Sequence, residues 1–95
     1  WAWALVLSEA APMRREAVLR RGVAFGQSRV ACGVHWQSDV DAGRVVGSAA
    51  VSALRGNAVF EAQMALAQKE VVARLAASPV QPAHCAAEAA ALKNF

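Results

Sequence analysis

The sequence predicts an all-α fold, a bundle of helices. Of the 95 residues, 57% are apolar, and only three prolines and six glycines interrupt them. Such a composition is typical of a folded helical protein rather than a disordered one. No segment alternates apolar and polar residues over a length that would make a strand. Because only 6% of the residues are aromatic, we expect a core of small side chains and marginal stability of the chain on its own.

Two helices are expected before residue 33. Residues 1 to about 9 are mostly apolar and predict a helix that ends at Ser8 and Glu9. Pro12 suits the first turn of a second helix, because proline needs no amide donor there. This helix is expected to run from Pro12 to Cys32, where Gly33 stops it.

The third helix is expected to begin near Ser38 and to run to about Leu54. Ser38 is a good N-cap residue. Asp39 and Asp41 fall in the first turn, where the helix dipole favours negative charge.

Two further helices complete the predicted bundle. Residues 55–57 form a turn in which Asn57 caps a helix over residues 58–77. Residues 78–82 are a predicted linker, and a short alanine-rich helix follows to about Leu92. The fourth helix carries apolar residues at spacings of three and four, which are Phe60, Met64, Ala67, Val71 and Leu75.

Helical wheels place one arginine and one aspartate among apolar residues. Arg29 falls in the middle of the apolar sector of the second helix, which holds Val18, Gly22, Phe25 and Cys32. Asp39 falls on the apolar stripe of the third helix, which holds Ala42, Val46, Ala49, Ala50 and Ala53. An inward arginine needs an anion, because it does not lose its proton. That anion is either a bound ligand or an acid of the chain such as Asp39.

His35 lies between these two charges and completes a candidate site. A carboxylate four residues later could accept the Nδ1 proton of His35 and leave Nε2 as a lone pair. An imidazole held in this way can act as a nucleophile or a base. Arg29 could grip the oxygens of a phosphate. The trio predicts half of a phosphoryl-transfer site.

The residues around this trio resemble a known signature. Residues 26–44 are similar to the third signature of the type-2 phosphatidic acid phosphatase superfamily, S-R-x5-H-x3-D. The segment Cys32-Gly-Val-His-Trp-Gln-Ser-Asp-Val40 resembles the soluble bacterial class A non-specific acid phosphatases of that superfamily. Residues 1–9 also resemble the helix that follows the second signature of those enzymes. The resemblance is good over about residues 1–55 and looser in the tail.

The resemblance implies a role for each matching residue. Arg29 binds the phosphate, with Ser28 supporting the loop. His35 attacks phosphorus and becomes a phosphohistidine, while Asp39 orients His35. The implied reaction is hydrolysis of phosphomonoesters without a metal or another cofactor. Vanadate would occupy the phosphate position as an analogue, or as the cofactor in the related haloperoxidases.

Two other signatures of the family do not occur in the chain. These are K-x6-R-P, which supplies a lysine and a second arginine, and P-S-G-H, which supplies further donors and a general-acid histidine. We therefore expect the isolated chain to be nearly inactive. The chain is expected to be the C-terminal part of a larger all-helical phosphatase domain. Residues 1–55 would form its catalytic helices, and residues 56–95 its packing helices and tail.

The two cysteines allow two interpretations. A disulfide between Cys32 and Cys85 would tie the tail to the helix that bears Arg29 and would fit an oxidising periplasmic or secreted location. Alternatively, Cys32, His35, His84 and Cys85 could supply four zinc ligands, although their spacing matches no compact zinc motif.

Charge and hydropathy limit the partners. The net charge of +3 is mild and the basic residues are mixed with acids, so we expect no nucleic-acid partner. No apolar run approaches the roughly 20 residues that span a bilayer, which argues against the membrane lipid phosphatases of the superfamily. Small phosphorylated substrates are the expected ligands, and homo-oligomerisation stays open. The remaining alternatives are a vanadium haloperoxidase and a non-catalytic helical fragment that docks a partner through its fourth helix.

Overall fold

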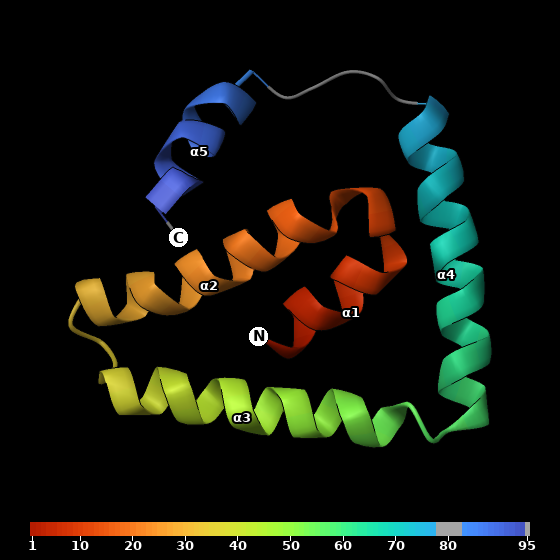
Figure 1. The fold of residues 1–95 in the computed structure, drawn as a ribbon, viewed down its shortest axis with the longest axis horizontal. Coiled ribbons are helices and arrows are strands. Elements are labelled where there is room, and N and C mark those ends of the chain that lie inside the picture. The colour runs from red at the N-terminus through yellow and green to blue at the C-terminus, as the bar shows by residue number, and fades with distance from the viewer. Residues whose placement is uncertain (78–82, 95) are drawn as a thin grey trace.

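The computed structural model describes residues 1–77 and 83–94, and these parts contain helices and no strand (Figure 1). The predicted all-α class is therefore confirmed. The predicted linker over residues 78–82 lies outside the described residues. The elements in chain order are α1 (Ala2–Ala10), the 3₁₀ turn η1 (Pro12–Arg14), α2 (Arg15–Ala31), α3 (Gln37–Leu54), α4 (Ala58–Ala77), α5 (Cys85–Ala91) and the 3₁₀ turn η2 (Leu92–Asn94).

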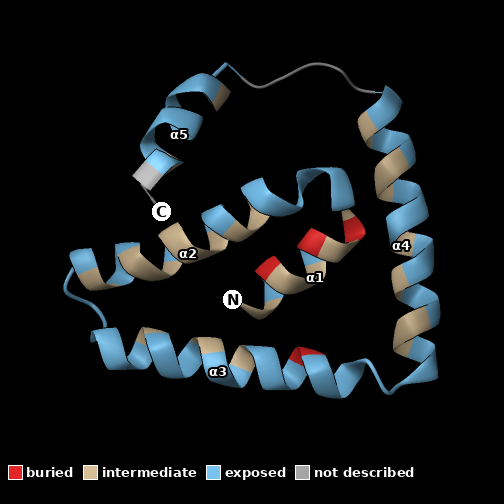
Figure 2. Ribbon diagram, in the orientation of Figure 1, coloured by how far each residue is buried: buried red, intermediate tan, exposed pale blue. Residues whose placement is uncertain are grey.

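Helix α1 lies at the centre of the molecule. Helices α2 and α3 flank it on two sides, and α4 crosses near its C-terminal end (Figure 1). The molecule measures 38 × 37 × 17 Å along its principal axes. Because one helix with its side chains is about 10–12 Å wide, the molecule is little more than one helix deep. The buried residues consequently gather on α1 (Figure 2).

The core consists of small residues, as the composition predicts. Among the described residues, the buried apolar side chains are those of Ala4, Ala10 and Val51. Ser8 is also buried, and its hydroxyl donates a hydrogen bond of 2.8 Å to the carbonyl oxygen of Leu5. This bond satisfies the hydroxyl within its own helix, so burial of Ser8 carries no unpaired donor.

Two glycines allow α1 to approach α2 and α3 closely. A Cβ on Gly22 of α2 would lie 2.5 Å from the Cβ of Ala4, and a Cβ on Gly47 of α3 would lie 3.1 Å from the backbone nitrogen of Ala2. The indole of Trp1 sits between these glycines and donates a hydrogen bond of 2.9 Å to the hydroxyl of Ser48. The absence of side chains at both glycines therefore sets the spacing of the three helices.

Substitution of Gly22 with alanine is expected to destabilise the chain by about 1–3 kcal/mol, because the new methyl group overlaps Ala4. Gly43→Ala in α3 is the matched control. Nothing lies within 4 Å of a Cβ on Gly43, so alanine there should stabilise the helix by about 0.5–1 kcal/mol. Thermal unfolding followed by circular dichroism measures both effects. A Gly22→Ala chain as stable as Gly43→Ala would contradict the close packing of α1 on α2.

The start of α4 and its inner face agree with the sequence analysis. The side-chain oxygen of Asn57 accepts hydrogen bonds of 2.9 Å from the amide of Val59 and 3.1 Å from that of Phe60. The predicted apolar positions are all half-buried, namely Phe60, Met64, Ala67, Val71 and Leu75. Neither this helix nor any other described one is long and apolar enough to cross a membrane.

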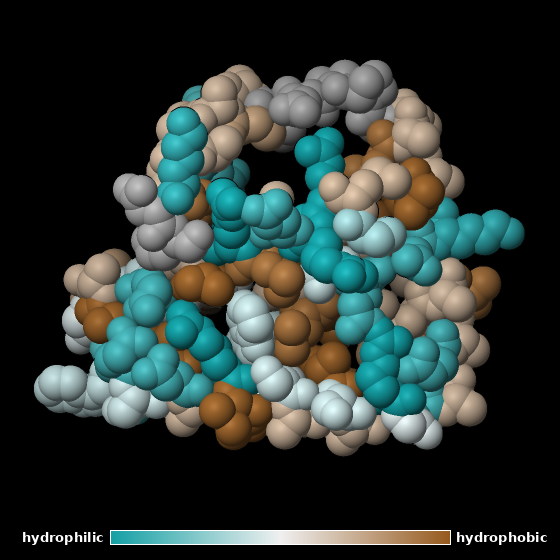
Figure 3. Space-filling view, in the orientation of Figure 1, coloured by the Kyte–Doolittle hydropathy of each residue, from teal (hydrophilic) through white to brown (hydrophobic). Residues whose placement is uncertain are grey.

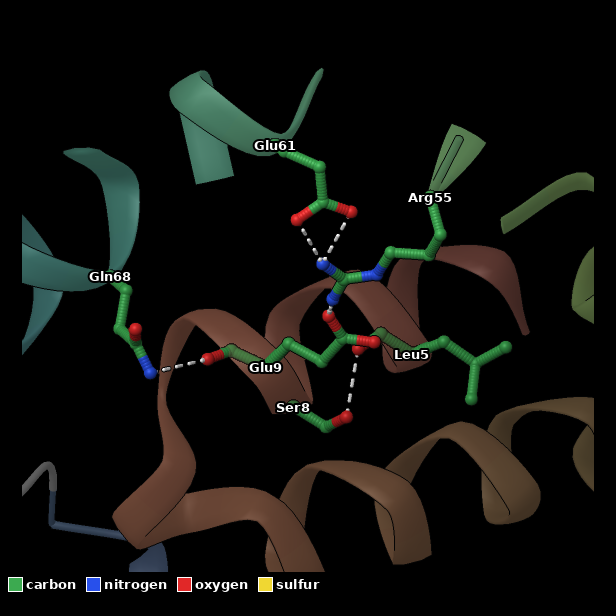
Figure 4. A network of polar contacts seen from close by, with 6 residues as sticks. All are labelled: Leu5, Ser8, Glu9, Arg55, Glu61 and Gln68. Atoms are coloured by element: carbon green, nitrogen blue, oxygen red, sulfur yellow. Dashed lines mark hydrogen bonds and ion pairs between the residues drawn. The ribbon is translucent and has the colours of Figure 1, made fainter. Parts of the chain in front are cut away.

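A polar network holds α4 against α1 (Figure 4). The guanidinium of Arg55 pairs with the carboxylate of Glu9 and, at 2.9 Å, with that of Glu61. The side-chain amide of Gln68 donates a 3.3 Å hydrogen bond to the backbone carbonyl of Glu9. Arg55 also lies over the ring of Phe60, 5.8 Å from the ring centroid. Arg55 thus links α1, the α3–α4 turn and α4.

The face of α3 that packs on its neighbours differs from the predicted one. The residues of α3 that face α1 and α2 are Val40, Arg44, Gly47 and Val51. The predicted stripe of Ala42, Val46, Ala49, Ala50 and Ala53 is exposed, and Val46 retains 67% of its accessible surface. The wheel prediction was wrong because α3 has two apolar faces, and α1 packs on the one that contains Gly47.

The predicted Cys32–Cys85 disulfide is not formed, and both thiols are free. Cys32 follows the C-terminal end of α2, whereas α5 is anchored near the middle of α2 by an ion pair of 3.0 Å between Glu88 and Arg21. Arg21 and Cys32 are 11 positions apart, or roughly 16 Å along a helix at about 1.5 Å per residue. The docking position of α5 therefore separates the two cysteines.

Candidate functional site

The turn between α2 and α3 carries the residues of the predicted site. Gly33 has a φ of +69°, in the left-handed region that suits glycine. Its amide donates a 2.9 Å hydrogen bond to the carbonyl of Val30. The amide of Val34 donates a 3.1 Å hydrogen bond to the carbonyl of Arg29. This pair of bonds is a Schellman motif, which ends α2 and reverses the chain at the glycine. The prediction that Gly33 stops the helix is confirmed.

The same turn sets the position of His35 relative to Arg29. The amide of His35 donates a second hydrogen bond, of 3.3 Å, to the carbonyl of Arg29. One carbonyl therefore anchors the backbone of both Val34 and His35. This contact gives a physical reason for the five residues between the arginine and the histidine, because a longer or shorter turn would not bring the histidine amide to that carbonyl.

Replacement of Gly33 with alanine is expected to destabilise the chain by about 1–2 kcal/mol, since a Cβ is disfavoured at positive φ. Gly33→Asn should cost less, because asparagine tolerates this conformation. Nothing lies within 4 Å of a Cβ on Gly33, so the loss reports backbone strain and not a clash. Urea unfolding of both variants measures the difference. Equal stability of the alanine variant and the parent would contradict the left-handed turn.

His35 and Asp39 are brought together at the start of α3. The Nδ1 atom of His35 lies 3.5 Å from the Oδ2 atom of Asp39, and the two side chains are 54% and 47% exposed. The same oxygen of Asp39 accepts a hydrogen bond of 2.9 Å from the amide of Trp36. The carboxylate is thus held by the backbone while it faces the imidazole.

The hydrogen bond from Trp36 to Asp39 also corrects the predicted start of α3. The helix begins at Gln37 with Trp36 as its N-cap, and not at Ser38. Asp39 is the third residue of the helix and reaches back to the N-cap amide, which is the acidic half of a capping box. Asp39 therefore has a structural contact as well as its contact with His35.

Arg29 lies in the last turn of α2 and is exposed, which corrects its predicted inward position. Helix α1 packs on α2 at Gly22, whereas Arg29 lies seven residues further along α2, roughly 10 Å towards its C-terminal end. Within the described parts of the chain, the ion pairs do not include Arg29, so the alternative of pairing with Asp39 is not formed. Ser28 donates a 2.7 Å hydrogen bond to the carbonyl of Phe25, within its own helix.

Arg44 is a half-buried charge of α3, five residues after Asp39. Its side chain is 28% exposed, and its Nη1 atom lies 3.4 Å from Asp41. Its Nη2 atom is buried without a hydrogen-bond partner in the described residues and would lie 3.7 Å from a Cβ on Gly26. The glycine in α2 makes room for the guanidinium.

The polar cluster around Arg55 contains charges that are already paired. A cleft of about 590 Å³ lies between α1 and α4 and includes Glu9, Arg55, Glu61 and Gln68 among its lining residues. Its charges pair with one another, as Figure 4 shows, so the cluster serves to hold the helices together.

Within the described residues no three potential metal ligands converge, so Cys32, His35, His84 and Cys85 do not form the alternative zinc site.

Comparisons with known proteins relate the chain to acid phosphatases. It is 54% identical over 70 residues to a non-specific acid phosphatase from Providencia stuartii, which covers 74% of this chain and 28% of that protein. It is 53% identical over 68 residues to one from Salmonella typhimurium, covering 72% of the chain and 27% of that protein. An acid phosphatase from Zymomonas mobilis is 46% identical over 71 residues, which are 75% of the chain and 27% of that protein.

No family model and no solved structure matches the chain. The three relatives nevertheless agree in name, and each is about half identical over about 70 residues. Over those residues the chain is similar to bacterial non-specific acid phosphatases, and it spans just over a quarter of the length of the relatives it matches.

Proposed function

We propose that the chain provides the nucleophile and a phosphate-binding arginine of an acid phosphatase that hydrolyses phosphomonoesters. In this proposal His35 is the nucleophile, Asp39 orients it, and Arg29 binds the phosphate oxygens, with Ser28 supporting the end of α2. The support from known proteins is the acid phosphatase name of the relatives.

The observation that carries the proposal is the contact between His35 and Asp39. A carboxylate 3.5 Å from Nδ1 favours the tautomer with its proton on that nitrogen. The Nε2 atom then keeps its lone pair and can attack phosphorus. Because the amide of Trp36 holds the same carboxylate oxygen, the aspartate is placed before any substrate arrives.

The proposed reaction has two steps. In the first, Nε2 of His35 attacks phosphorus, the bond from phosphorus to the ester oxygen breaks, and a general acid from outside this chain protonates the leaving alcohol. In the second, water attacks phosphorus and gives a proton back to that acid group, the phosphorus–nitrogen bond breaks, and inorganic phosphate leaves with His35 restored. Arg29 would stabilise the negative charge on the equatorial oxygens of the transferred phosphoryl group. Stabilising this charge is the main requirement of catalysis in phosphoryl transfer.

The cellular setting is proposed from the family resemblance. A periplasmic or secreted location would fit the soluble class A enzymes.

The proposal is tested with a chimeric phosphatase, in which this chain replaces the matching residues of the Providencia stuartii relative. We expect the chimera to hydrolyse p-nitrophenyl phosphate in the presence of a metal chelator. The isolated chain should show almost no turnover, because it lacks the other donors of the site. A folded chimera without activity, next to an active parent enzyme, would contradict the proposed function.

A further inference from the structure

The outward face of α3 has no cover in this structure. We define this face by Ala42, Val46, Ala49, Ala50 and Ala53, which are all exposed. On a helical wheel with steps of about 100° per residue, the centre of this face lies about 150° from the face that packs on α1. A helix that is apolar on two opposite sides is usually covered on both of them.

We propose that the outward face of α3 is the surface on which the remaining part of an acid phosphatase domain packs. The proposal rests on the proposed function, since it takes the partner to be the rest of the same enzyme. The chain matches only 28% of the Providencia stuartii relative, so nearly three quarters of such a protein is available to cover it. The small side chains of the face would allow a partner helix to approach closely.

The position of the face favours this partner over a second copy of the chain. Asp39 lies on the same side of α3, at its N-terminal end, so a partner that covers the face also reaches the His35–Asp39 pair. These side chains are about half exposed, whereas phosphoryl transfer needs fixed donors around the phosphate. A second copy would bring the same residues again and none of the missing donors.

The exposed apolar surface agrees with a missing partner. Val46 retains 67% of its accessible surface, although it is a β-branched residue in the middle of a helix. Apolar atoms are visible at the surface along the lower edge of Figure 3, where α3 runs. The flat shape, 17 Å along the shortest axis, leaves such surfaces open to a second layer of helices.

The test compares Val46→Asp with Ser52→Asp, both in the isolated chain and in the chimeric phosphatase. Ser52 is exposed on the polar side of α3 and serves as the matched control. In the isolated chain both substitutions should leave the melting temperature nearly unchanged, because both sites face water. In the chimera Val46→Asp should lower the melting temperature by about 10 °C, because the new charge is buried without a partner. Ser52→Asp should leave the melting temperature of the chimera nearly unchanged.

Each other outcome contradicts the proposal. Equal melting temperatures of the two variants in the chimera would mean that the outward face stays in water. A chimera that does not fold would mean that this face does not fit the surface of the relative. Self-association of the isolated chain that Val46→Asp abolishes, seen by analytical ultracentrifugation, would assign the face to a second copy. Because the readout is stability, a folded but inactive chimera would count against the proposed function and not against this interface.

Discussion

Replacement of His35 with alanine in the chimeric phosphatase is expected to lower kcat for p-nitrophenyl phosphate on the order of 10⁴-fold or more. Loss of a nucleophile removes the whole reaction path, and what remains comes from binding and fixed donors. The exposed His84 at the start of α5 provides the control, and His84→Ala should leave kcat unchanged. An enzyme that retains its kcat without His35 would rule out this nucleophile.

Asp39→Asn separates the two contacts of the aspartate. The amide oxygen of asparagine can still accept the hydrogen bond from Trp36, so the start of α3 and the melting temperature should be preserved. The negative charge beside His35 is lost, and kcat should fall on the order of 10²- to 10⁴-fold. A loss of kcat that merely follows a loss of folded protein would assign Asp39 to the helix cap alone.

Arg29→Ala tests the proposed phosphate-binding residue. We expect the inhibition constant of vanadate for the chimera to rise by about 100-fold, because charge-assisted hydrogen bonds to the bound anion are lost. Arg29→Lys should recover only part of the affinity, since lysine offers a point charge and not a planar fork. The inhibition constant is measured from vanadate inhibition of p-nitrophenyl phosphate hydrolysis by the chimera and by its Arg29→Ala and Arg29→Lys variants.

Arg20→Ala is the control for the loss of one positive charge. Arg20 lies on the exposed side of α2 and pairs with Glu16, four residues earlier. Its removal should leave vanadate inhibition nearly unchanged. If Arg20→Ala and Arg29→Ala weakened vanadate binding equally, the effect would come from the overall charge of α2 and not from a specific contact.

The helices and their ends could be predicted from local chemistry. Gly33 ends α2 through its left-handed conformation, and Asn57 caps α4 with its side-chain oxygen. Such signals act within a few residues, so the sequence contains all of the information they need. The N-cap of α3 was predicted at Ser38 and is Trp36, because Ser38 and Asp39 can both serve a helix N-terminus. Only the backbone geometry shows that Asp39 reaches back to Trp36.

Predictions that depended on which helix faces which were less accurate. The stripe around Val46 was expected to be buried, but α1 packs on the side of α3 that contains Gly47. Both faces are apolar, so periodicity alone cannot choose between them. The pairing of Cys32 with Cys85 failed for a related reason, because it depends on where α5 docks along α2.

The candidate site was partly accessible from the sequence. The i, i+4 spacing of His35 and Asp39 predicts their contact, and the structure places the two side chains 3.5 Å apart. The position of Arg44 was missed, because its burial depends on Gly26 in a different helix. Contacts within one element follow from spacing, whereas contacts between elements require the packing.

In the proposed mechanism His35 carries the phosphoryl group during turnover. The most direct test is to mix the chimeric phosphatase with p-nitrophenyl phosphate, denature it within the turnover time at alkaline pH, and analyse its peptides by mass spectrometry. Alkaline conditions are needed because the phosphorus–nitrogen bond of phosphohistidine is labile in acid. We expect one phosphoryl group on the peptide that contains His35, and none in the His35→Ala variant. A phosphoryl group on another residue, or steady turnover with His35 never modified, would contradict it.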